Sequence, residues 1–288
     1  MPVDMSALAG DVAAETAVTR ALVAGLSEED WHIATPAPGW DIADQISHLA
    51  HFDQVAVQAA RHPDEFSPEQ VHPDAIAARY RDRTGAQLLA WFDRARADLL
   101  ATYAGIDPAT RLPWFGPPMS AASSLTARFM ETWAHTQDIA DALGVTREPN
   151  DRLRHVAHIG VGARAYSYAV NSRPQPAGPV RVRLTAPSGA EWTWGPADAA
   201  DRISGPALDF CLLVTQRGHR DDLSLTAEGP AAVEWMTIAQ AFAGPPGPGR
   251  RPARDRRSTG RSASRTARGS TATGSPPPGR CWTARSTC

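Results

Sequence analysis

Residues 123–144 read SSLTARFMETWAHTQDIADALG, and the spacing of the apolar residues predicts one long amphipathic helix. Four apolar side chains recur at about helical intervals and would face a core: Leu125, Phe129, Trp133 and Ala140. Ser123 or Ser124 can cap the start of this helix, and Gly144 can end it. We therefore expect the rest of the chain to pack around this helix.

Three ionisable side chains share a second stripe of the same helix. Glu131, His135 and Asp138 stand at positions i, i+4 and i+7, which places a carboxylate beside an imidazole. Such a pair can hold a divalent metal if another helix supplies a third ligand. The alternative is an ordinary solvated i, i+4 interaction worth about 0.2–0.5 kcal/mol, and spacing alone favours this alternative.

Further amphipathic segments flank this helix and predict a four-helix bundle. The other three expected helices span residues 5–26, 41–62 and 74–103. Asp41, which follows Gly39 and Trp40, is expected to cap the second of them. A fifth helix over residues 151–170 is expected to lean against the bundle.

The pattern changes after the breaker run NSRPQPAGP at residues 171–179, which indicates a boundary between domains. Alternation over residues 180–194 predicts a hairpin that turns at residues 187–189. The other elements expected in this small α+β unit are a helix, a strand and a helix over residues 206–216, 223–226 and 231–242.

The predicted fold class is therefore α plus α+β. We expect a helical bundle over residues 1–172, a small α+β domain over 173–244 and a disordered tail over 245–288. The tail is rich in Arg, Pro and Ser and has too few aliphatic residues to form a core. Its abrupt onset is also typical of an out-of-frame reading of a GC-rich gene.

The distribution of charge argues against one class of partner. The chain has a formal net charge of −2 and no Lys, and from residue 244 onward it holds ten Arg against one acidic residue. Residues 1–243 then carry 19 Arg against 30 acidic residues, so the part expected to fold is acidic. Because nucleic-acid binding needs a basic patch on the fold, we expect no nucleic-acid partner. A role with nucleic acid would rest on the tail alone.

The sequence also predicts the compartment. No stretch approaches the roughly 20 apolar residues of a membrane span, and the N-terminus lacks the basic and apolar regions of a secretory signal. The three cysteines do not suggest a disulfide framework, and Cys211 in an apolar stretch is expected to be buried and inert. We therefore expect a cytoplasmic protein with no membrane partner.

The third metal ligand is expected on the second helix. His48 and His51 lie three residues apart there and could point to similar faces. Spacing alone does not separate them.

Two motifs resemble the metal-binding domain of the mycothiol-dependent maleylpyruvate isomerase family, which lies within the DinB-like four-helix bundle superfamily. They are Gly39-Trp40 followed by His48-Leu49, and Glu131-Thr-Trp-Ala-His135-Thr-Gln-Asp138. The resemblance covers nearly all of residues 5–170 and is greatest to an uncharacterised actinobacterial branch. It implies a DinB-like bundle in which His48, Glu131 and His135 hold zinc or another divalent metal.

The second domain resembles the C-terminal domain of these isomerases, which is similar to sterol-carrier proteins. That resemblance implies a catalytic role for Arg217, although the chain reads LLVTQRG there and the family more usually has Trp-Gly-Arg. Compensation of the helix dipole is an alternative reason for a cation at this place.

The resemblance implies a thiol-dependent enzyme, an isomerase or an S-transferase. Mycothiol would be the thiol cosubstrate, and the substrate would be a small electrophile. Two imidazoles and one carboxylate leave a tetrahedral metal with an open position, where an incoming thiol would lose its proton. Asp138 is expected to orient a ligand imidazole or a bound water. The alternative is a non-catalytic metal- or lipid-binding module, and we expect a monomer or a homodimer.

Overall fold

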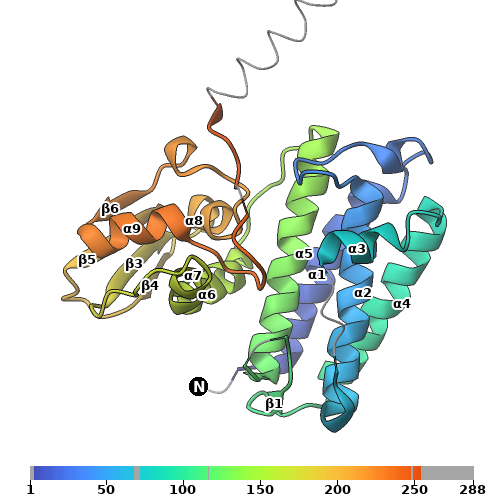
Figure 1. Ribbon diagram of the computed structural model, residues 1–288, viewed down its shortest axis with the longest axis horizontal. Helices are drawn as coiled ribbons and strands as arrows, with labels where there is room; N and C mark the ends of the chain where they lie inside the picture. The colour runs from blue at the N-terminus through green and yellow to red at the C-terminus, as the bar shows by residue number, and fades with distance from the viewer. Residues whose placement is uncertain (1–2, 68–71, 116, 248, 254–288) are drawn as a thin grey trace, which may run out of the picture. The chain divides into compact units, whose positions relative to one another are not determined.

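In the computed structural model the stretch quoted above forms α5 (Ala121–Leu143), the central helix of a bundle. The structure describes residues 3–67, 72–115, 117–247 and 249–253. The chain divides into two units, Met1–Arg250 and Arg251–Cys288, and all the elements named below belong to the first. The other bundle helices are α1 (Met5–Val23), α2 (Ile42–Arg61) and α4 (Gly85–Tyr103): α1 and α2 pack against α5, and α4 packs against α2 and α1 (Figure 1).

Side-chain caps fix the start of each bundle helix. Asp41 and Asp44 form a capping box at the start of α2, and Thr84 and Gln87 form another at the start of α4. The cap of α5 is Ser120, whose hydroxyl accepts from the backbone N–H of Ser123 at 3.1 Å. The cap predicted at Ser123 or Ser124 is therefore wrong by one turn.

Gly144 adopts a left-handed conformation with φ of 67° and ends α5 as predicted.

The helix predicted over residues 74–103 is two helices. α3 (Pro73–Ala78) ends in a turn, and α4 begins only at Gly85. The Thr84 cap favours this break, and Gly85 is needed because a Cβ there would lie 2.2 Å from Nε1 of Trp31. The sequence did not predict this turn, because the apolar spacing of a helix continues across the residues between α3 and α4.

The fifth predicted helix is also divided, into α6 (Leu153–Gly162) and α7 (Arg164–Val170). The break follows Gly162, a residue of low helix propensity. α6 packs between α5 and the second part of the chain, and a Cβ on Gly160 would lie 2.7 Å from Val214. This close approach joins the bundle to the α+β part.

The α+β part contains one four-stranded sheet in the order β4-β3-β5-β6. Its elements are β3 (Val180–Thr185), β4 (Glu191–Trp194), β5 (Asp201–Pro206), α8 (Ala207–Val214), β6 (Thr226–Glu228) and α9 (Pro230–Ile238). The predicted hairpin is confirmed as β3 and β4, which are antiparallel. β5 pairs in parallel with β3 and antiparallel with β6. Helices α8 and α9 pack against the sheet.

Three details of this part differ from the prediction. The central strand β5 was not predicted, because DRISGP has only one strongly apolar residue, Ile203. The strand expected over residues 223–226 begins at Thr226, and the last helix ends at Ile238. Short strands carry little periodic signal, so pairing with neighbours decides their limits.

Two short strands complete the described elements, β1 (Arg111–Leu112) and β2 (Met119–Ser120), with 3-10 turns at Asp30–His32, Pro63–Glu65 and Arg220–Asp222. Apolar packing continues from α5 through α6 to the sheet, while a second cluster fills the other end of the bundle around Ile46 and Phe92. None of the described helices has the length and hydropathy of a membrane span.

The predicted fold class, a helical bundle followed by a small α+β part, is confirmed. The domain limits at residues 172 and 244 stay predictions. Most of the predicted tail, residues 254–288, lies outside the described residues.

Candidate metal centre

The three side chains expected to bind a metal converge between α2 and α5. Nε2 of His48 lies 3.6 Å from Oε2 of Glu131, and Nε2 of His135 lies 3.2 Å from the same oxygen. One donor atom from each residue lies within 4.8 Å of the other two. The side chains are only 11%, 19% and 8% exposed for His48, Glu131 and His135. A buried cluster therefore replaces the solvated pair that spacing alone allowed.

Hydrogen bonds determine which nitrogen of His135 is free. Thr35 Oγ1 donates to the Trp40 carbonyl at 2.9 Å, so it accepts from the side-chain amide of Gln45. That contact turns Oε1 of Gln45 toward Nδ1 of His135, which donates to it. With a metal bound, a His135 ring that donates from Nδ1 would carry its lone pair on Nε2, the atom that faces Glu131.

Gln45 was not predicted as part of the site. Asp138 was expected to orient a ligand imidazole, and this is wrong for His135, whose two nitrogens contact Gln45 and Glu131. The signal for Gln45 was its place three residues before His48 on the same helix, which puts both on one face. The sequence could not show that this face of α2 packs against His135 of α5, because that contact depends on how the two helices pack.

Replacing Gln45 with alanine is expected to weaken Zn²⁺ binding about ten- to a hundredfold, because His135 loses the acceptor that fixes its tautomer. A competition titration against a chromophoric chelator measures the affinity. Gln137→Ala is the control, since Gln137 lies on the same helix as His135 and, among the described residues, bonds to Asp141 and Arg147 and not to the cluster. Equal affinities for both variants would contradict this role of Gln45.

Aromatic rings shield the two histidines from water. Trp40 stacks on His135 with ring centroids 5.9 Å apart, and its centroid lies 5.3 Å from that of His48. Phe52 also packs against His48, with ring centroids 4.6 Å apart. Trp40 is held in place because its Nε1 donates to Asp74 at 2.8 Å.

Burial and the neighbouring charges set the protonation of the cluster. Burial, followed by the charge of His135, lowers the pKa of His48 to about 3, so its ring is neutral at pH 7. Burial alone would raise the pKa of Glu131, but hydrogen bonds from His135 and His48 hold it well below its usual value. At neutral pH the cluster therefore presents the neutral imidazole of His48 and the carboxylate of Glu131, the forms of these two groups that bind metals.

The donor set and its spacing fit a divalent metal. In a tetrahedral zinc site with bonds of about 2.0–2.1 Å, neighbouring donor atoms lie about 3.3 Å apart. The two nitrogens lie 3.2 and 3.6 Å from Oε2 of Glu131, on either side of that value. Imidazole and carboxylate suit zinc and also several other divalent ions.

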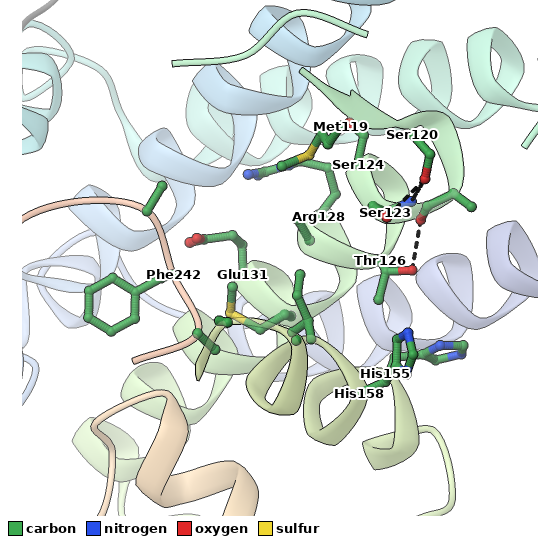
Figure 2. Close-up of a pocket in the computed structure, with 18 of the residues that line it drawn as sticks. Met119, Ser120, Ser123, Ser124, Thr126, Arg128, Glu131, His155, His158 and Phe242 are labelled. Atoms are coloured by element: carbon green, nitrogen blue, oxygen red, sulfur yellow. Dashed lines mark hydrogen bonds between the residues drawn. The ribbon is translucent and has the colours of Figure 1, made fainter. Parts of the chain in front are cut away.

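A pocket of about 690 Å³ lies along α5, and Glu131 is among the residues that line it. Apolar side chains make up much of its wall, including Trp114, Met130 and Phe242. Figure 2 shows Glu131 in this pocket together with Arg128, and with His155 and His158 of α6. The pocket gives a small molecule a place beside the cluster.

Arg217 lies in the turn after α8 and binds Asp138 of α5. Its Nη2 donates to Oδ2 of Asp138 at 2.7 Å, and its Nη1 donates to the Thr215 carbonyl, also at 2.7 Å. Arg250 donates to the other carboxylate oxygen of Asp138 at 2.8 Å. Arg217 thus contacts the helix that carries Glu131 and His135, as a catalytic role would require. All three nitrogens of its guanidinium group, however, already donate to Asp138 or Thr215. Its catalytic role stays a prediction.

Two family models match the chain. Residues 12–140 match the mycothiol maleylpyruvate isomerase N-terminal domain, and this region includes all three residues of the cluster. Residues 176–228 match a model described as wyosine base formation.

Similarity to known proteins extends over most of the chain. An uncharacterised protein of Mycobacterium tuberculosis, found in two strains, is 46% identical over 255 residues, which covers 86% of this chain and 99% of the relative. Two crystal structures of mycothiol-dependent maleylpyruvate isomerase, one of them a mutant, align with TM-scores of 0.58 and 0.56 at 15% and 16% identity. Each alignment covers 80% of this chain and 96% of the isomerase, so the two proteins share a fold. The chain therefore belongs to one family with the uncharacterised mycobacterial protein, and its residues 12–140 are similar to the mycothiol maleylpyruvate isomerase N-terminal domain.

Proposed function

We propose that this chain is a metal-dependent enzyme that uses a low-molecular-weight thiol to act on a small electrophile. The observation that carries the proposal is the convergence of His48, Glu131 and His135 at the edge of a pocket. Similarity to mycothiol-dependent isomerases supports mycothiol as the thiol, and the donor set supports zinc or another divalent ion as the metal.

The residues of this chain have distinct parts in the proposal. His48, Glu131 and His135 would hold the metal, and Gln45 keeps the Nε2 lone pair of His135 directed at it. When bound, the metal would stabilise the thiolate form of a thiol over the protonated form. Trp40 and Phe52 exclude water from the two imidazoles.

A thiolate in this pocket has two reactions open to it. It can add to an activated carbon–carbon double bond, forming a C–S bond while the π electrons move to the carbonyl. Rotation about the resulting single bond and loss of the thiolate give cis/trans isomerisation. If a proton is instead taken up at carbon, the adduct is kept and the reaction is an S-transfer.

The test has two steps on the purified full chain. Elemental analysis is expected to find close to one divalent metal ion per chain. Nuclear magnetic resonance is then expected to show conversion of a maleyl-type substrate only when mycothiol is present, with thiol-free and metal-chelated samples as controls. Protein without metal, or conversion that ignores the thiol, would overturn the proposal.

The alternative, a non-catalytic metal- or lipid-binding module, is favoured by the apolar wall of the pocket. Native mass spectrometry separates the two: a co-purified lipid and no metal would favour the module. The cytoplasmic location and the state of monomer or homodimer stay predictions.

A further inference from the structure

A buried group of three charges lies in the bundle beside the candidate metal centre. Asp53 of α2 is fully buried and accepts from Nε of Arg96 at 2.7 Å and from Nε of Arg128 at 3.0 Å. The side chains of both arginines are only 3% exposed. One carboxylate thus faces two guanidinium groups, which leaves a surplus positive charge in the interior.

The two arginines are not equally satisfied. Arg96 also donates to Thr16 Oγ1 at 3.0 Å and to Thr132 Oγ1 at 2.9 Å, so each of its three nitrogens has an acceptor. Arg128 donates from Nη2 to the Leu49 carbonyl over a long 3.4 Å. Its Nη1 has no acceptor among the described residues and is not sealed from solvent. Arg128 therefore carries the surplus charge.

The position of Arg128 connects this charge to the pocket. Arg128 and Glu131 both line the pocket from neighbouring turns of α5, as Figure 2 shows. Three residues of helix rise about 4.5 Å, so the two side chains leave the helix only a short distance apart. A buried guanidinium that shares its counter-ion with a second guanidinium is costly, and an anion in the pocket would compensate the surplus charge.

We propose that Arg128 binds an anionic group, a carboxylate in particular, of the small molecule that occupies this pocket. The guanidinium fork suits a carboxylate, and the desolvated site strengthens the hydrogen bond. The proposal deepens the proposed function and rests on it for the chemistry beside Glu131. The charged group of the bound molecule and its reacting carbon would then be separated by a few bonds.

A catalytic role was expected for Arg217, but Arg128 is better placed to bind an anion in the pocket. Two nitrogens of Arg217 donate to Asp138 and the third donates to Thr215, and Arg217 does not line the pocket. Arg154 does line the pocket, but it is exposed on α6 with its guanidinium over the Trp192 ring.

The experiment is a calorimetric titration of the full-length protein with maleate and with its neutral diamide. Arg128→Met is expected to weaken maleate binding about ten- to a hundredfold, because a charged hydrogen bond is lost. Binding of the diamide is expected to stay within about twofold. Arg154→Met is the control for general attraction, and as an exposed charge it is expected to weaken maleate binding by no more than about threefold. Arg128→Lys keeps the charge but loses the fork, so its affinity should lie between wild type and Arg128→Met.

The metal content of the same samples separates the two proposals. Normal metal content with maleate affinity unchanged in Arg128→Met would overturn the role of Arg128 and leave the proposed function standing. If the protein contained no metal but Arg128→Met still lost maleate affinity, the proposed function would be overturned and the role of Arg128 would stand. If Arg128→Met does not fold, unchanged maleate affinity in Arg128→Lys would overturn the role of Arg128. Equal losses in the Arg128→Met and Arg154→Met variants would also overturn it.

Discussion

Replacing His135 with alanine is expected to lower the affinity for Zn²⁺ by at least about a hundredfold. Structural zinc sites gain about 10–16 kcal/mol from four ligands, so one ligand contributes about 3 kcal/mol. His48→Ala should have an effect of the same size, because both Nε2 atoms face Glu131. The affinity is measured by competition with a chromophoric chelator at pH 7.

His51→Ala is the matched control for these two variants. His51 lies on the same helix as His48, but its Nδ1 contacts the Tyr80 hydroxyl at 3.0 Å, and His51 is not in the cluster. Its removal is expected to change the zinc affinity less than threefold, an estimate for a residue outside the ligand set. A loss in His51→Ala as large as that in His48→Ala would refute the ligand assignment. Circular dichroism should show that all three variants keep their helices.

Replacing Asp53 with asparagine is expected to lower the free energy of unfolding by about 3–5 kcal/mol. The variant leaves Arg96 and Arg128 buried side by side without a negative charge, and breaking a buried pair in this way is strongly destabilising. Urea denaturation followed by circular dichroism measures the change.

Asp98→Asn provides the comparison for a surface pair. Asp98 binds Arg61, and each of these side chains is 47% exposed, so the expected loss is about 0–1 kcal/mol. If Asp53→Asn and Asp98→Asn had the same free energy of unfolding, the buried group of Asp53, Arg96 and Arg128 would contribute no more to stability than a surface ion pair. That result would contradict the account of the bundle interior.

The candidate ligand set shows how far sequence reasoning could go. Glu131 and His135 share a helix face by spacing alone, and that spacing predicts their contact. Choosing His48 over His51 needed the resemblance to a family, because a shift of three residues on one helix hardly changes the face. The structure brings His48 to the other two residues and leaves His51 beside Tyr80.

The contacts around that set could not be derived in the same way. Gln45 and His135 are 90 residues apart, and Arg217 and Asp138 are 79 apart. Asp53 and Arg128 were equally unremarkable in the sequence, yet together with Arg96 they form the charged interior of the bundle. Each of these contacts depends on how two helices or two parts of the chain dock.

The sequence by itself determined the helices of the bundle, the hairpin of the sheet and the residues able to bind a metal, because periodicity and residue chemistry are local properties. Only the tertiary structure decided where the third helix breaks at Gly85, how β5 enters the sheet, and that Arg128 and Glu131 line one pocket. The reason is physical: a side chain's partner across the core is set by packing between distant segments, and the spacing of residues along one segment does not contain that information.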